Sequence, residues 1–204
     1  MTEPLSPPKY HADHPGFAGF TGLLAALSMA FGRKIDARQA VRLSGLRSGD
    51  TVVDIGCGPG VAVRYAERQG ATVTGIGPAP VMLSVAKLLT RHRAKVQYVE
   101  GVAEALPLQD HSISVVWSIA TVHHWGDIDS GLRGAHRVLL PGGRLVAIER
   151  LTKSGVSGHA SHGWSEDQAS AFMDRCRDHG FGDVHVERST NGRRSTLSVV
   201  GNVI

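Results

Sequence analysis

The residues best suited to chemistry lie in the run VVDIGCGPG, residues 52–60. An apolar stretch that contains Asp54 passes directly into glycines at alternate positions, namely Gly56, Gly58 and Gly60. Glycine lets a backbone approach a ligand closely, and a helix that begins after such a turn offers N–H groups that lack a partner within the helix. The run therefore predicts a buried strand, a ligand-binding turn and a helix, in that order.

The elements that position this turn follow a regular pattern from Thr51 onward. Short apolar runs alternate with amphipathic stretches, which is typical of an α/β fold with a mainly parallel sheet. The expected strands cover residues 51–55, 72–76, 96–100, 113–118 and 144–149. The expected helices include 36–46, 79–92 and 127–140, the last stopped by the Pro-Gly-Gly of residues 141–143.

The end of the chain departs from this alternation. Ser165 followed by Gln168 predicts a capping box for a helix that ends near Gly180. Two β-like runs, residues 184–188 and 195–203, then flank an Asn-Gly pair. Such a pair indicates a hairpin, here with a loop longer than two residues, so we expect the sheet to finish with an antiparallel strand.

The amino-terminal region has a different character. Residues 1–15 contain four prolines and predict an extended tail, whereas residues 16–32 carry no charge. A membrane span needs roughly 20 apolar residues and a signal peptide has a basic leader, so a buried or interfacial helix is favoured over stable membrane insertion. We expect residues 1–47 to form a tail and helical cover and residues 48–204 the main domain. Whether the apolar helix covers the active site or packs in a homodimer stays open.

Composition limits the remaining classes. The 204 residues, 42% hydrophobic and 20% charged, fit one soluble domain and exclude disordered, collagen-like and polytopic membrane proteins. Two cysteines cannot make a disulfide framework or a four-thiolate zinc site, so a cytoplasmic setting is expected. His159 and His162 have no Cys or acidic pair at metal-binding spacing, and no metal is predicted. A loop over residues 152–164, near the substrate mouth, is expected instead.

The charge balance points to no particular macromolecule. The formal net charge is +4, from 22 basic and 18 acidic residues. The basic residues are spread along the chain and are not interleaved with aromatic residues. No nucleic-acid partner is therefore predicted.

Two ligand classes compete for the glycine turn. A dinucleotide fold has the pattern G-x-G-x-x-G, but the spacing here is G-x-G-x-G. The run resembles the first motif of the class I S-adenosylmethionine-dependent methyltransferases, of the small-molecule type seen in ubiquinone and menaquinone biosynthesis. Residues 75–83, 101–107, 118–125 and 140–145 resemble four further motifs of this family in order. The resemblance covers about residues 45–150.

The resemblance implies a Rossmann-like sheet, mainly parallel, with an antiparallel C-terminal hairpin strand and an N-terminal helical cover. It implies S-adenosyl-L-methionine as cofactor, S-adenosyl-L-homocysteine as product and a small organic acceptor. In the family, the glycine turn holds the methionine part, and later motifs meet adenine and the sulfonium. The cofactor-binding positions carried over are Asp54, Gly56, Cys57, Gly58, Gly60, Gly77, Pro78, Met82, Val102, Ala103, Ser118 and Ile119.

One of these positions departs from the family pattern. Where the family usually has an acidic residue that accepts the ribose hydroxyls, this sequence has Gly77. Losing a charged acceptor costs roughly 1.5 to 3 kcal/mol, or about tenfold to 150-fold in affinity. Glu104 or a water is a candidate replacement. Val102, where the family often has a polar residue, is a milder departure.

The chemistry itself asks little of side chains. Aligning a nucleophile with an activated methyl group supplies roughly 7 to 11 kcal/mol, and a general base adds about 10²- to 10⁴-fold when the acceptor loses a proton. His123 and His124 are the candidate bases, and a structural role is the alternative for each. Two other functions stay open: a methyltransferase-like module that binds a ligand or partner without catalysis, prompted by Gly77, and a nicotinamide-dependent oxidoreductase.

Overall fold

The computed structural model describes residues 34–153, 162–192 and 194–204. These residues form a sheet of seven strands in the order β3-β2-β1-β4-β5-β7-β6. The strands are β1 (Thr51–Ile55), β2 (Thr72–Gly77), β3 (Val96–Glu100), β4 (Ile113–Ile119), β5 (Leu139–Arg150), β6 (Phe181–Asn191) and β7 (Arg194–Val203). β1 to β5 run parallel to one another, and β7 is antiparallel to both β5 and β6. The expected mainly parallel sheet with an antiparallel end is confirmed.

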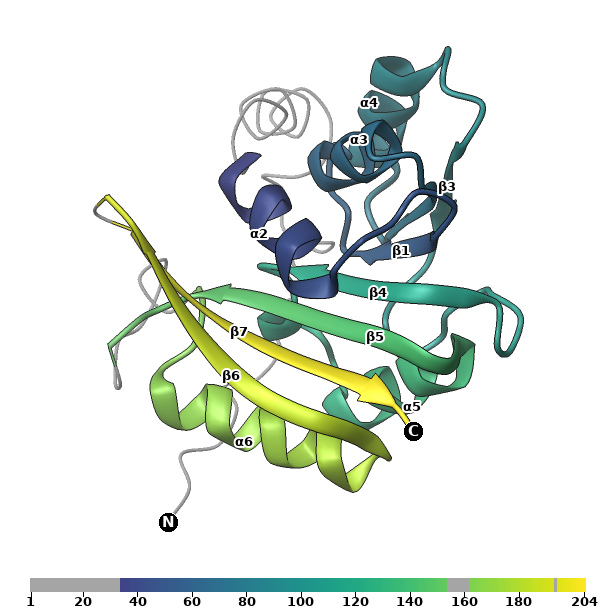
Figure 1. Cartoon of the computed structure of the whole chain (residues 1–204). Coiled ribbons are helices and arrows are strands. Elements are labelled where there is room, and N and C mark those ends of the chain that lie inside the picture. The colour runs from purple at the N-terminus through teal and green to yellow at the C-terminus, as the bar shows by residue number, and fades with distance from the viewer. Residues whose placement is uncertain (1–33, 154–161, 193) are drawn as a thin grey trace.

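Helices cover both faces of this sheet (Figure 1). They are α2 (Lys34–Ser44), α3 (Val61–Arg68), α4 (Pro80–Thr90), the short 3-10 helix η2 (Val122–His124), α5 (Ile128–Val138) and α6 (Glu166–Asp178). One buried cluster joins α2, α3 and α4 to the sheet, and a second joins α5 and α6 to the opposite face. The arrangement is a three-layer α/β sandwich.

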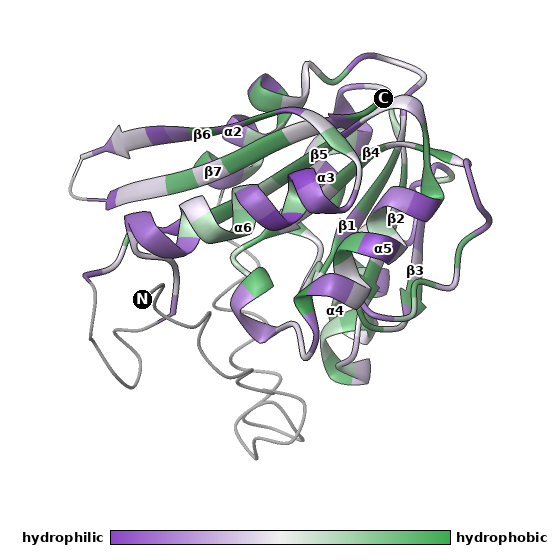
Figure 2. Cartoon of the chain, turned by 90° about the horizontal axis from the view of Figure 1, so that it is seen from below, coloured by the Kyte–Doolittle hydropathy of each residue, from purple (hydrophilic) through white to green (hydrophobic). Residues whose placement is uncertain are grey.

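The strand sequences explain why two cores form. Successive side chains of a strand point to opposite faces, so Val52 packs with the α2 to α4 side and Val53 with the α5 and α6 side. β5 alternates in the same way, with Val146 in the first cluster and Leu145 in the second. Figure 2 shows hydrophobic residues along these strands, while α5 and α6 also carry hydrophilic residues on their outer sides.

β5 begins earlier than the sequence indicates. It starts at Leu139 rather than at residue 144, and residues 141–143 lie within the strand instead of forming a turn before it. The register explains the difference: Ile113 pairs with Leu139 and Val115 with Arg144, so a bulge absorbs the Pro-Gly-Gly segment. Gly142, with φ 73°, provides the left-handed backbone at this bulge.

The C-terminal hairpin is tighter than expected. Asn191 of β6 pairs with Arg194 of β7, so two residues connect the strands. The prediction of a longer loop was wrong because β6 continues past the apolar run through polar residues that pair along β7. The capping box of α6 is confirmed, since the Ser165 hydroxyl accepts from the Gln168 N–H at 3.2 Å and the Gln168 side chain accepts from the Ser165 N–H at 2.9 Å.

α2 is fixed to the sheet by polar contacts as well as by its apolar face. The Gln39 amide donates to Ser198 at 2.9 Å and accepts from Thr196 at 3.1 Å, both on β7. The tail, the apolar segment 16–32 and residues 154–161 of the expected loop lie outside the described residues. The division at residue 47 and the helical cover therefore stay predictions. Across the described ranges, no helix is both long and apolar enough to cross a bilayer.

Candidate active site

A cavity of about 1010 Å³ opens where the parallel strands end. It is lined by the ends of β1, β2, β4 and β5 and by the loops that follow them. In an open α/β sheet, ligands bind at this carboxyl edge, where strand order reverses around β1 and β4. The sequence motifs therefore converge on one hollow.

The glycine turn after β1 forms one wall of the cavity. Gly56, Gly58 and Gly60 have φ values of 74°, 50° and 74°, a backbone region that favours glycine. A Cβ atom on Gly56 would lie 2.5 Å from the Thr121 side chain, and one on Gly60 would overlap the Tyr98 hydroxyl. At Gly58 a Cβ atom would meet nothing within 4 Å. Packing requires the outer two glycines, whereas Gly58 faces the space that a ligand can occupy.

Hydrogen bonds with β2 and with Arg64 of α3 fix the shape of this turn. The N–H groups of Gly56 and Cys57 donate to the Ile76 carbonyl at 2.8 and 3.0 Å, and the Arg64 guanidinium donates to the Pro59 carbonyl at 2.7 Å. These two N–H groups already have partners inside the protein. Asp54, only 3% exposed, lies at the start of the turn and lines the cavity. The turn is thus a rigid backbone cradle with one carboxylate at its base.

Cys57 in the middle of the turn is chemically quiet. Its burial, together with the nearby charge of Asp54, raises the pKa of the Cys57 thiol well above its usual range. Because a thiol reacts as its thiolate, this side chain acts as a small apolar group and not as a nucleophile at neutral pH.

Gly77 closes β2 at the cavity wall. A Cβ atom there would lie 3.7 Å from Leu83 and 3.9 Å from the Cys57 sulfur, which are ordinary contacts. The position therefore has room for a side chain. Glu104 also lines the cavity, but its carboxylate accepts from the N–H groups of Gly126 and, at 3.1 Å, of Asp127. It joins two loops, and this limits its use as a substitute for the missing acid.

The opposite wall carries three imidazoles. They belong to His123 and His124 of η2 and to His162, all of which line the cavity. The ring centroids of His123 and His124 are 3.8 Å apart, and the His162 centroid lies 5.3 Å from that of His123 and 5.7 Å from that of His124. The His123 Nδ1 lies 2.9 Å from a carboxylate oxygen of Glu149, whose side chain is fully buried at the end of β5. Within the described ranges, no group of three or more potential ligands could hold a metal ion. His159 lies outside those ranges.

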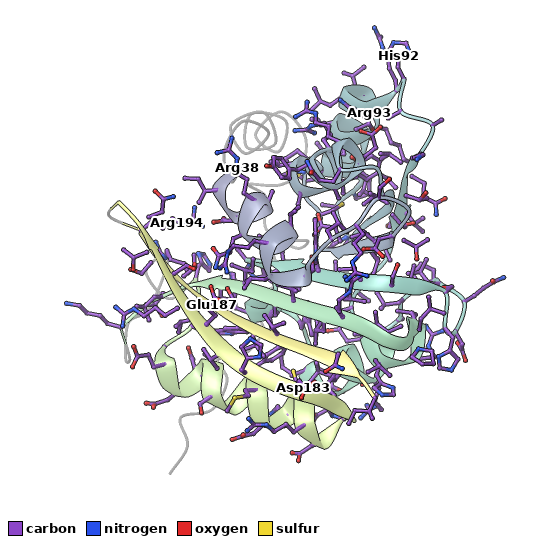
Figure 3. The ribbon with its side chains drawn as sticks, in the orientation of Figure 1. Arg38, His92, Arg93, Asp183, Glu187 and Arg194 are labelled. Atoms are coloured by element: carbon purple, nitrogen blue, oxygen red, sulfur yellow. The ribbon has the colours of Figure 1, made fainter. Side chains whose placement is uncertain are left out.

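Two arginines line the far end of the cavity, together with Leu151 and Ser195. Arg150 ends β5 and Arg194 begins β7. The Arg194 guanidinium donates to Asp36 of α2 at 2.9 Å, and the Asp36 side chain is only 2% exposed. Figure 3 shows Arg194 between the hairpin and α2.

Comparison with known proteins agrees with this geometry. Residues 53–147 match a family model described as "Methyltransferase domain". The chain is 34% identical over 112 residues to the demethylmenaquinone methyltransferase of Tropheryma whipplei (strain Twist), covering 55% of this chain and 46% of that protein. It is 40% identical over 126 residues to the 27-O-demethylrifamycin SV methyltransferase of Amycolatopsis mediterranei (strain S699), covering 57% and 46%. Over residues 53–147 the chain is thus similar in sequence to methyltransferases of the class I S-adenosylmethionine-dependent type.

The fold of the chain is shared with solved structures. A SAM-dependent methyltransferase from Aquifex aeolicus superposes with a TM-score of 0.74 at 17% identity, over 89% of this chain and 98% of the other. The chain spans about half the length of the curated relatives it matches. The family resemblance and the fold class are therefore confirmed.

The structure brings most of the predicted site residues to one cavity. Those that line it are Asp54, Gly56, Cys57, Gly58, Gly77, Pro78, Met82, Val102, Ala103, Ile119, His123 and His124. Gly60 and Ser118 are not among the lining residues. Ser118 is fully buried, and its hydroxyl lies 2.8 Å from that of Thr121, which in turn donates to the Ile55 carbonyl at 2.9 Å. Ser118 and Gly60 therefore support the wall from behind.

Sequence reasoning missed several residues at or behind the cavity wall, chiefly Thr121, Glu149, Arg150 and Arg194. Glu149 gave one signal, since a carboxylate follows a run of apolar residues at the end of a predicted strand. Arg194 gave none, because its place at the cavity depends on the pairing of β7 with β5.

Proposed function

We propose that this chain binds S-adenosylmethionine in the cavity and transfers its methyl group to a small organic acceptor. The observation that carries the proposal is the glycine turn, whose Gly58 opens onto the cavity while His123 and its buried carboxylate partner line the same space. The names of the relatives favour a small acceptor, since they act on demethylmenaquinone and a demethylrifamycin.

The residues present fit the cofactor. The open face of Gly58 and the carboxylate of Asp54 suit the charged methionine part, and the buried Met82 and Ala103 suit the flat adenine. Pro78, Val102 and Ile119 complete these walls. When bound, the cofactor supplies a methyl group already activated by the positive charge on its sulfur.

His123 is the residue that we assign to proton removal from the acceptor. A neutral imidazole carries one proton, and the Glu149 carboxylate 2.9 Å from Nδ1 favours that proton on Nδ1. This leaves Nε2 as the basic nitrogen. Once Nε2 takes a proton, the buried carboxylate stabilises the imidazolium, as in other pairs where a carboxylate orients a histidine. The His124 ring, with its centroid 3.8 Å away and tilted by 53°, packs against the His123 ring and helps to fix it.

Titration calorimetry with S-adenosylmethionine, S-adenosylhomocysteine and NADPH tests the cofactor. We expect both sulfur ligands to bind at micromolar strength and NADPH to give no heat. Binding of NADPH alone would contradict the proposal and favour an oxidoreductase.

A non-catalytic ligand-binding module is the second candidate. Gly77 favours it, because the residue that the family uses to hold the ribose is missing and Glu104 is engaged elsewhere. A protein that fails to bind either sulfur ligand at millimolar concentration would support this alternative. Transfer of a labelled methyl group from S-adenosylmethionine to any small acceptor would exclude it.

A further inference from the structure

The two ends of the cavity differ in charge. Of the carboxylates among its described lining residues, Asp54 lies at the glycine turn and Glu104 accepts from the N–H groups of Gly126 and Asp127. The far end is lined by the guanidinium groups of Arg150 and Arg194. A ligand that reaches this end meets two cationic side chains.

The strand register places the two arginines together. Arg150 of β5 pairs with Thr196 of β7, and Arg194 lies two residues before Thr196, so it projects to the same face. That face is the one covered by α2, because the Thr196 hydroxyl donates to Gln39. Diagonal neighbours on antiparallel strands are about 7 to 8 Å apart, within reach of long side chains. Both guanidinium groups can therefore meet one ligand group.

Arg194 is held in place for such a role. Its contact with Asp36 at 2.9 Å involves a carboxylate that is almost fully buried, so this contact anchors the guanidinium at the cavity although 41% of the Arg194 side chain is exposed. A guanidinium has five N–H donors in a rigid fork, and a single carboxylate oxygen cannot accept all of them. The geometry of the fork also matches a second carboxylate.

His123 lies across the cavity from this pair. Glu149 precedes Arg150 on β5, so its side chain points to the opposite face of the strand. The Glu149 carboxylate contacts His123 on that face. The apolar residues Ile119, Leu151 and Trp125 also line the cavity. His123, these apolar side chains and the two arginines therefore all line the same cavity.

We infer that the acceptor is an amphipathic acid, with an apolar body and a carboxylate held by Arg150 and Arg194 while its reacting atom meets His123. This assignment rests on the proposed function and names the class of molecule that the site selects. It makes the two arginines specificity-determining residues rather than catalytic ones.

Equilibrium binding of matched acids and amides tests the inference. The probes are benzoate, cinnamate and octanoate, each paired with its primary amide, which has nearly the same shape without the charge. Titrations are run with and without S-adenosylhomocysteine, so the result for the acids stands even if the protein fails to bind the sulfur ligand. We expect at least one acid to bind about tenfold to 150-fold more tightly than its amide.

Two variants assign the effect to the arginines. Arg150→Gln should abolish the preference for the acid. Arg194→Gln removes one guanidinium contact from the buried Asp36, so the double variant Asp36→Asn with Arg194→Gln removes both charges and serves as the second test. Arg188→Gln is the matched control, because Arg188 pairs with Glu166 at 2.9 Å and is not among the cavity-lining residues.

The outcomes separate the two proposals. Acid preference that is lost in both test variants and kept in Arg188→Gln supports the inference. Equal affinity for acid and amide, no saturable binding of any acid, or a preference that survives in Arg150→Gln would overturn it. Failure of S-adenosylhomocysteine to bind would count against the proposed function alone.

Discussion

The two ends of the cavity are built from different material. At the glycine turn the wall is backbone, shaped by left-handed glycines and held by the Ile76 carbonyl. Away from the turn the wall is made of side chains, the arginines of β5 and β7 and, across from them, the imidazoles of η2. A backbone cradle can change little without losing its shape, whereas side chains can be exchanged one by one. The first end therefore suits a ligand common to a family, and the second suits an acceptor that differs among its members.

The largest effect should come from filling the backbone cradle. Gly58→Val places a branched side chain in the open space beside the turn and should abolish binding of S-adenosylmethionine, measured by calorimetry. The substitution also strains a residue with φ 50°. Gly142→Val is the matched control, since Gly142 has φ 73°, has no neighbour within 4 Å and is not among the lining residues. Retained affinity in Gly58→Val would remove the turn from the binding site.

The next effect belongs to the side-chain end. His123→Asn should lower kcat by about 10²- to 10⁴-fold and leave the affinity for S-adenosylmethionine unchanged, because a base acts on the acceptor. Glu149→Gln should lower kcat in the same direction and alter the pH profile, since its amide no longer selects the Nδ1 proton. Single-turnover rates with a labelled methyl group measure both. An unchanged kcat in His123→Asn would show that the acceptor needs no base from this residue.

The two ends also differ in how far the sequence predicts them. β1 and β3 have the bounds expected from their apolar runs, and the turn after β1 lies where its glycines indicate. All of this information is local, carried by neighbouring residues within a motif. The far end depends on contacts between distant residues: Glu149 meets His123 across 26 positions and Arg194 meets Asp36 across 158. The hydrophobic periodicity of a sequence does not predict pairings between residues this far apart.

The same reasoning explains the errors in the fold. The Pro-Gly-Gly segment before Arg144 has the composition of a turn, but pairing with β4 draws it into a bulged strand. Ser118 and Gly60 stay predictions as cofactor-site residues, and the structure places Ser118 against Thr121 and Gly60 against Tyr98. Composition identifies a position as special, while the surrounding fold decides which atoms it contacts.

Gly77 offers a test in which the backbone end gains a side chain. Gly77→Asp should tighten S-adenosylmethionine binding by about tenfold to 150-fold, because a Cβ atom fits there and a carboxylate can accept the ribose hydroxyls. Gly77→Ala is the control for backbone stiffening and should leave the affinity nearly unchanged. Equal affinities for the two variants in calorimetry would mean that the ribose lies elsewhere.

The smallest expected effect concerns the alkylation of Cys57, the thiol in the glycine turn. Burial and Asp54 raise the pKa of Cys57, and burial also raises that of Cys176, so both thiols stay protonated at pH 8 in the folded protein. In the unfolded chain their pKa falls to roughly 8.5, and a sizeable fraction becomes thiolate. Iodoacetamide should therefore label neither cysteine in native protein, as read by mass spectrometry, and label both in urea. Rapid native labelling of Cys57, with Cys176 still protected, would show that the backbone cradle opens to solvent and is less rigid than the side-chain end.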